Sequence, residues 1–588
     1  MNCRRAVILP TVMFVLLLLG LFGAMFAFRI NADVAATRAV ATRMQTRLAA
    51  EAGLERVKLL LQSSREDMDT WYHNPDELNR ILVWAHGLDP RIFGTDEDLD
   101  EGTMAYRFSV VADDPTDDEE YVRFGVTDES SKLNLNQATR DQLLILVRAA
   151  IDEDQELDPL DIVGAILDWR DQDSTPQTEA GDTEGSYYEE LDKPYKMRNG
   201  PFDSVEELLL VKGITAQLLY GEDIDRNGLM TPNEDDGDST FPPDNQDNVL
   251  NRGLYPYLTV YSYENNVSND NRRRIYLFGE ANAVREELAM VFEDEPDVVD
   301  YIVEVTRGQG PARPARGRRT GPRGNTGRPG TQPAGSTPLD TGNSAIEPDD
   351  GDNKAATRRQ ASGADTEDEE NGDEGEDPTA EEAEDEQPGG EAENPESEPE
   401  TNDAGPASGP IRTPAALLLP RSISGELRDG PVGPEHLAAM LDRTTVVPPD
   451  QQRIVGLINV NTAPALVLRC LDLNDDQVRA IIETRDSLDG EQKSTPAWLV
   501  TEEVVDLVTF ERLAPRITAR GQQFTIEVLG FADHVGMVTR LQTIVDLVGP
   551  IAETLYYRDV THLGGAFPIR EEDKEKAFDL LEVLKSES

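Results

Sequence analysis

The stretches KLNLNQATRDQLLIL at 132–146 and LINVNTAPALVLRCL at 457–471 follow one pattern. The aligned pairs are Asn134 with Asn459, Asn136 with Asn461, and Ala138 with Ala463. Alternating aliphatic residues and asparagines indicate a short extended entry, and Asn136 and Asn461 are expected to cap the helices that follow. The sequence therefore predicts two related helical modules.

The repeat is also similar to helix-hairpin-helix modules, some of which bind the DNA backbone through a glycine-rich hairpin. The second copy continues as LDLNDD at 471–476, without a glycine, and the first has Asp152, Glu153 and Asp154 at the comparable place. Acidic groups repel phosphate, and the whole chain has a net charge of −59. Packing or protein contact is thus favoured for these modules, and nucleic acid is disfavoured as a partner.

The N-terminus contains an uncharged apolar run from Ala6 to Phe28, preceded by Arg4 and Arg5. A run of this length can span a bilayer, and the preceding arginines favour a cytoplasmic N-terminus with the rest exported. A cleaved signal peptide is the alternative, although Gly23-Ala24-Met25 matches a cleavage site poorly. A helical pattern continues to residue 61, so anchor and stem are predicted to form one helix.

Alternating runs at 106–110, 121–126, 523–531 and 537–548 predict strands of an antiparallel sheet. The fold class is therefore α+β, with a long N-terminal membrane helix, a small antiparallel sheet, inserted SAM-like or helix-hairpin-helix-like modules, and a long disordered linker. The predicted segments are the anchor and stem (1–62), first strands (104–131), first helical module (132–254), strand return with extra helices (255–307), linker (308–410), second helical module (454–515) and C-terminal strands (523–548). The tail after Gly549 is expected to be loosely held.

The predicted linker has low complexity, first basic with Gly and Pro, then strongly acidic. Such a composition buries too little apolar surface to offset the entropy of ordering the chain, which predicts disorder. Its basic part could bind nucleic acid, but a solvated linker outside the cytoplasm is favoured.

An acidic loop at 222–234, EDIDRNGLMTPNE, fits the calcium-loop pattern D-x-D-x-N-G-x5-E. The predicted ligands are Asp223, Asp225, Asn227, the Leu229 carbonyl and Glu234. Calcium takes six to eight oxygen ligands, alternating side chains place several on one side of a turn, and Gly228 permits the bend. Pro232 opposes a helix after the loop, so a complete EF-hand is not expected. The alternative is a solvated acidic turn.

A second acidic cluster follows the predicted helix at 160–167. Its candidate ligands are Asp168, Asp171, Asp173, Asp182 and Glu184. Carboxylates this dense repel each other unless a cation neutralises them, which suggests a second calcium site without a fixed ligand spacing.

Taken together, these segments resemble a known family, the K-type minor pseudopilins of the type II secretion system. The resemblance is carried by RAVILPT at 5–11, KLNLNQA at 132–138, ILDWRDQDS at 166–174, YYEELDKPYKMRNGPFDSVEELLLVKGIT at 187–215 and INVNTAP at 458–464. It implies a small sheet into which a large helical domain is inserted, with calcium bound in that domain. It also implies other minor pseudopilins as partners, and a single-pass inner-membrane protein with most of its chain in the periplasm.

The resemblance further implies cleavage by a prepilin peptidase after Ala6, which makes Val7 the first mature residue. The fifth mature position is then Thr11, where most pilins have Glu and the K type does not. The predicted function is a structural, non-catalytic tip component of a pseudopilus that supports protein export. A DNA-uptake or type IV pilus tip component is the alternative. An enzyme is disfavoured, because five scattered histidines and two cysteines form no catalytic or zinc-binding pattern.

Overall fold

The computed structural model describes most of the chain outside the predicted linker. The described residues are 8–86, 103–113, 122–151, 157–172, 175–176, 186–235, 237, 241–243, 247, 249–307, 410–423, 426–549, 551–565 and 567–569. The predicted linker at 308–410, apart from residue 410, lies outside them, as do Ala6, Val7, Asp173, Asp182 and Glu184.

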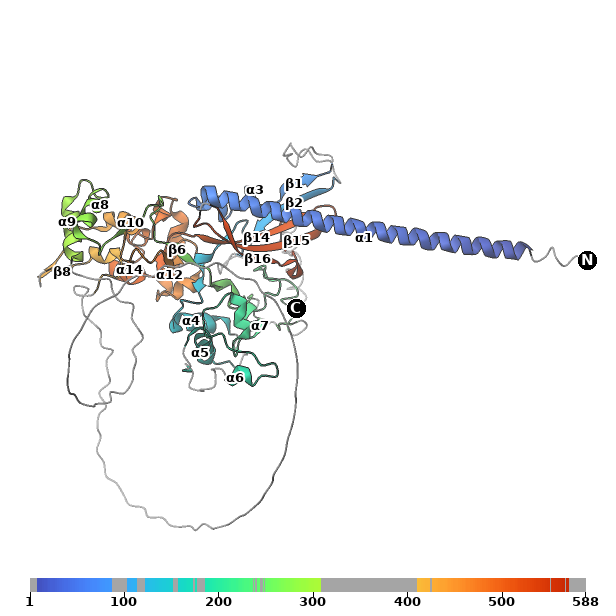
Figure 1. Cartoon of the computed structure of the whole chain (residues 1–588), viewed down its shortest axis with the longest axis horizontal. Coiled ribbons are helices and arrows are strands. Elements are labelled where there is room, and N and C mark those ends of the chain that lie inside the picture. Colours follow the sequence, from blue (N-terminus) through green and yellow to red (C-terminus); the bar gives the residue numbers. More distant parts are fainter. Residues whose placement is uncertain are drawn as a thin grey trace, which may run out of the picture. The chain divides into compact units, whose positions relative to one another are not determined.

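One long helix, α1 (Ile8–Ser64), forms the N-terminal part of the described chain (Figure 1). Its first half is exposed and, by length and composition, apolar enough to cross a membrane. Its second half packs on β2, β14 and β15. The residues that face the sheet recur every three or four positions and include Thr46, Ala50, Leu54, Val57 and Leu61, which is the spacing of one helix face. Anchor and stem are thus one helix, as predicted.

The sheet has six strands in the order β1-β2-β14-β15-β16, and β3 also pairs with β14. The strands are β1 (Ile81–Ala85), β2 (Ala105–Val111), β3 (Thr127–Asp128), β14 (Gln523–Ala532), β15 (Met537–Asp546) and β16 (Glu553–Asp559). All pairings are antiparallel. Because β2 and β14 are neighbours in space, about 400 residues of chain lie between two adjacent strands. The predicted α+β fold with inserted helical modules is confirmed.

Three details of the predicted sheet need correction. The first part of the tail after Gly549 is not loosely held, because β16 pairs along β15 and completes an edge of the sheet, while residues 570–588 lie outside the described residues. Strand β1 was not predicted. Residues 122–126 form only an isolated bridge, between Ala112 and Arg123, in place of the predicted strand.

The region inserted between β2 and β14 contains three modules, and each is closed by its own short pair of parallel strands. Module 1 (133–259) pairs β4 (Leu133–Asn134) with β5 (Leu258–Thr259) in parallel. Module 2 (275–445) pairs β7 (Ile275–Tyr276) with β10 (Thr444–Thr445) in the same way. Module 3 (458–518) pairs β12 (Ile458–Asn459) with β13 (Ile517–Thr518). Each second strand ends in a threonine whose hydroxyl accepts the backbone N–H two residues later. Module 2 was not predicted as a copy, and the predicted linker lies inside it.

Helices fill each module between its paired strands. Module 1 contains α4 (Arg140–Ala150), α5 (Pro159–Arg170), α6 (Ser186–Glu189) and α7 (Ala216–Tyr220). Module 2 contains α8 (Ala281–Ala289), α9 (Pro296–Thr306) and α10 (Leu437–Arg443). Module 3 contains α11 (Ala465–Arg469), α12 (Asp475–Ser487), α13 (Trp498–Thr501) and α14 (Leu507–Leu513). The other α-helices and strands among the described residues are α2 (Met68–Trp71), α3 (Pro75–Leu78), β6 (Tyr263–Asn265), β8 (Arg421–Ile423), β9 (Glu426–Arg428) and β11 (Arg453–Val455).

The asparagines of the repeat do not cap helices, so that prediction is wrong. Asn136 hydrogen-bonds the backbone of Phe202 in both directions, at 2.7 and 3.0 Å. Asn461 accepts from Trp498 Nε1 at 3.1 Å and donates to two distant carbonyls. The cap of α4 is Thr139, which forms a capping box with Gln142. The second asparagine of each copy therefore fastens the entry loop to a later part of its own module.

Modules 1 and 3 share one apolar core, to which module 2 contributes Ala415 and Leu437, while the rest of module 2 and the sheet with α1 have cores of their own. Gln142 of α4 donates to the carbonyl of Cys470 at 3.1 Å across the contact between modules 1 and 3. The two copies predicted from the sequence thus pack on each other.

Candidate metal centre

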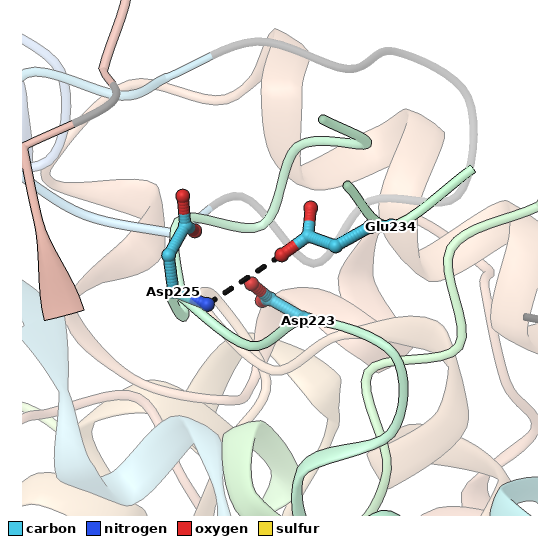
Figure 2. A group of neighbouring side chains, drawn as sticks. All are labelled: Asp223, Asp225 and Glu234. Carbon is cyan, nitrogen blue, oxygen red and sulfur yellow. Dashed lines mark hydrogen bonds between the residues drawn. The ribbon is translucent and has the colours of Figure 1, made fainter. Parts of the chain in front are cut away.

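The acidic loop at 222–234 follows α7 within module 1 and brings three carboxylates together. One oxygen from each of Asp223, Asp225 and Glu234 lies within 4.8 Å of the others (Figure 2). Asp223 and Glu234 are buried, with 5% and 3% of their surface exposed. Figure 2 also shows the backbone N–H of Asp225 directed at the Glu234 carboxylate.

Hydrogen bonds from backbone N–H groups of the loop to the carboxylates of Asp223 and Glu234 hold the loop in this conformation. Asp223 accepts from the backbone N–H groups of Asn227, at 3.0 Å, and Gly228, at 3.1 Å. Glu234 accepts from the N–H groups of Ile224 and Thr231, both at 2.9 Å. Gly228 has a φ of +72°, a conformation that a side chain would disfavour. The first and last acids of the motif therefore hold both ends of the loop together.

Electrostatics within this cluster favour an added cation. Burial, together with the neighbouring Asp113, Glu234 and Asp225, raises the pKa of Asp223 to about 8. Burial and Glu234 together raise the pKa of Asp225 to about 7. A divalent cation would reverse both effects, because it replaces lost hydration and offsets the repulsion. The donor set is all oxygen, which suits calcium better than a transition metal.

Two further predicted ligands have other contacts in this arrangement. The Asn227 side chain accepts from the N–H of Leu229 at 2.6 Å and donates to Asp225 at 2.9 Å. The Leu229 side chain packs against the core of the sheet. Their roles as ligands stay predictions, while the structure does bring the three acids of the motif together.

The second predicted cluster is described only in part. Asp168 is fully buried on α5, and Asp171 follows as the residue that ends this helix. The other three candidates, Asp173, Asp182 and Glu184, lie outside the described residues. A second calcium site here stays a prediction.

Residues that sequence spacing could not identify surround the loop. Arg252 donates to the carbonyl of Gly228 at 2.9 Å and to Asp113 at 3.0 Å. Arg540 donates to the carbonyls of Asp225 and Arg226 at 2.6 and 2.8 Å. Because these partners lie up to 315 residues away along the chain, no local motif points to them.

Two comparisons with known proteins give matches. Residues 126–220 and residues 458–514 each match a family described as type II secretion system (T2SS), protein K. These two ranges cover parts of modules 1 and 3. No curated protein sequence matches the chain.

Among solved structures, the chain is similar to one in the crystal structure of the GspK-GspI-GspJ complex from the enterotoxigenic Escherichia coli type 2 secretion system. The sequence identity is 10%, and the alignment covers 89% of this chain and 99% of the other. The TM-score is 0.34, a level of likeness that supports no inference about partners.

Proposed function

We propose that this chain, a member of the protein K family of type II secretion systems, forms the structural tip of a pseudopilus with other minor pseudopilins. It is a component of the type II secretion pseudopilus. The observation that carries this assignment is the pair of protein K matches on two modules inserted into one sheet. The alternative of a DNA-uptake component is not favoured.

Assembly with other minor pseudopilins is supported by an unpartnered apolar face on α1. Val40, Met44 and Leu48 recur every four residues and are 62%, 62% and 53% exposed. Residues at this spacing lie on one side of a helix and suit packing against a neighbouring helix. The rest of α1 toward the N-terminus supports a single-pass inner-membrane anchor with the bulk of the chain in the periplasm.

Co-purification of the full chain in detergent with candidate minor pseudopilins tests this assembly. The wild type should retain a partner, and Met44→Glu should lose it. Val535→Glu, a change of equal charge at a 56% exposed side chain in the β14–β15 turn, should retain it. Absence of any complex, or salt-dependent binding of DNA in its place, would oppose the proposal.

Processing by a prepilin peptidase after Ala6 belongs to the same proposal. Mass spectrometry of the protein from membranes should then show Val7 as the first residue. A mature start near residue 25 would indicate an ordinary signal peptide and would contradict the pilin-type anchor.

We also propose that Asp223, Asp225 and Glu234 hold a structural calcium ion, which would neutralise three close carboxylates. An ion that binds only the folded state stabilises it by about 2.7 kcal/mol at a hundredfold excess over Kd. Chelation should therefore lower the melting temperature of the full chain, and calcium should restore it better than magnesium.

The loop is tested by the double variant Asp223→Ala with Glu234→Ala, which should lose most of the calcium response. The matched control is Asp475→Ala with Asp476→Ala, which removes the same charge from the first turn of α12. If the loop variant keeps the full response, this loop is not the site, and the cluster around Asp168 and Asp171 becomes the better candidate.

A further inference from the structure

A buried arginine of the sheet reaches into the acidic loop. Arg540 lies on β15 with 1% of its surface exposed. Its two terminal nitrogens donate to the carbonyls of Asp225 and Arg226, and its Nε pairs with Glu527 on the neighbouring strand β14. The planar guanidinium thus fixes two consecutive peptide groups of the loop relative to two adjacent strands.

A second arginine binds the loop at the next turn. Arg252 joins the carbonyl of Gly228 to Asp113, which follows β2. The backbone of the loop also lies close to Asp113, because a Cβ on Gly228 would lie 2.1 Å from Asp113 Oδ1. The loop is therefore held to the end of β2 as well as to β15.

The remaining face of the loop packs on the rest of module 1. The Arg226 guanidinium lies 3.9 Å from the ring centre of Tyr220 and 4.9 Å from that of Tyr255. Side chain and main chain of Arg226 thus point to different partners, one in module 1 and one in the sheet. The acidic loop connects the two parts of the fold.

We propose that Arg540 is a positioning residue for calcium, assisted by Arg252, and that it couples calcium binding to the stability of the sheet. The proposal rests on the proposed calcium site. By holding the peptide groups between Asp225 and Gly228, the arginines keep the carboxylates converged before an ion arrives, which lowers the entropy lost on binding. Coupling is reciprocal, so calcium must in turn stabilise the contact between β15 and the loop.

The charge of Arg540 acts in the opposite direction, because a cation repels calcium. Its ion pair with Glu527 offsets this repulsion. When the charge of Arg540 is removed, loss of positioning should weaken calcium binding, whereas relief of repulsion should strengthen it. Measurements of calcium affinity therefore distinguish the two effects. A lysine keeps the charge but lacks the planar fork that reaches two carbonyls.

The test is calorimetric titration of the full chain in detergent with calcium chloride alone. Arg540→Met and Arg540→Lys should both weaken binding about tenfold or more, as changes in groups around a metal site commonly do. The matched control is Arg558→Met on β16, because Arg558 binds Glu206 of module 1 at 3.1 Å without contacting the loop. The control should bind within about twofold of the wild type.

Hydrogen exchange gives the second measurement. Calcium should slow exchange of β14 and β15 amides in the wild type and in Arg558→Met, but not in Arg540→Lys. If Arg540→Met does not fold, Arg540→Lys and Arg252→Lys carry the test.

The inference is overturned if the wild type binds calcium and the Arg540 variants bind equally well or more tightly. It is also overturned if calcium protects the strands to the same extent in Arg540→Lys. Failure of the wild type to bind calcium, in contrast, removes the proposed metal site itself.

Discussion

Gly530 of β14 decides how closely α1 can approach the sheet. A Cβ at this position would lie 2.0 Å from the carbonyl oxygen of Thr46, 2.5 Å from the backbone nitrogen of Ala50 and 2.8 Å from its Cβ. Ordinary contacts begin at 3.4 Å. The two closest atoms belong to the helix backbone, so no side-chain rotation can relieve the contact, and Gly530→Ala must displace α1.

The cost of this displacement follows from the contacts around it. Overpacking of a core costs about 1–3 kcal/mol, and the upper end applies where backbone atoms collide. Moving α1 also separates the buried hydroxyls of Thr46 and Thr539, which lie 2.8 Å apart, and a hydrogen bond of this kind contributes about 1 kcal/mol. We expect Gly530→Ala to lower the stability of the sheet by about 3–4 kcal/mol.

Denaturant unfolding of the full chain, followed by fluorescence, measures this loss. Trp71 packs edge-on against Phe524 of β14, with ring centres 5.0 Å apart, so its emission reports on the core between α1 and the sheet. Gly490→Ala is the control, because a Cβ there meets nothing within 4 Å. Adding Ala50→Gly to Gly530→Ala should not restore stability, since it removes only one of the three contacts. An unfolding curve for Gly530→Ala that overlays the wild type would refute the close approach of α1.

Three other predictions concern charge and the linker. Burial raises the pKa of Asp128 to about 6, despite hydrogen bonds from Asn459 and Thr462, so its contribution to stability is present below about pH 4 and is lost as the pH rises through 6. Asp128→Asn should flatten this fall in melting temperature between about pH 4 and 7, and an unchanged pH profile would show that another group titrates. Calcium affinity, measured by titration, should decrease on acidification below about pH 8, because Asp223 and Asp225 must lose their protons to bind, and a flat profile would oppose the proposed ligands. Deletion of 312–408 should leave the melting temperature nearly unchanged, and a fall of many degrees would show that the segment packs.

The repeat allowed prediction of modules 1 and 3 but not of module 2. Modules 1 and 3 both begin with alternating aliphatic residues and asparagines, which are visible in the sequence. Module 2 begins with Ile275 and Tyr276 and closes with Thr444 and Thr445, and these share no asparagine with the other copies. Its paired strands are also separated by the linker. The relation of module 2 to the other two modules is visible only in the structure, in the common register of the parallel strand pairs and in the shared threonine hydrogen bond.

The strands at the sheet edges were hard to predict for a similar reason. In β16, with the sequence ETLYYRD, exposed Leu555 and Tyr557 alternate with half-buried Tyr556 and Arg558, so neither face is a clear apolar stripe. What holds this strand is its pairing with β15, together with the contact of Arg558 with Glu206. Such tertiary contacts leave no periodic signal.

Sequence spacing located the three acids that converge in the acidic loop, because the calcium-loop pattern places alternating side chains on one side of a turn. The same spacing could not find Arg540, Arg252 or Asp113, which come from other parts of the fold. It also misassigned Asn136 as a cap, because its amide binds Phe202, a residue that folding alone brings near.

The position of the linker within module 2 sharpens the expected effect of its deletion. Both flanks are held in one core, since Ile302 and Val305 of α9 pack with Ile411 and Ala416. For a flexible segment, closure costs about 0.6 kcal/mol for each doubling of length, so about a hundred residues cost roughly 3 kcal/mol more than a short turn. Burial of these flanking residues offsets that cost. Shortening the segment should remove part of this closure cost and leave the flanking core residues in place. Any change in melting temperature should therefore be upward. A downward change would require contacts between the linker and the modules, which hydrogen exchange in module 2 would then locate.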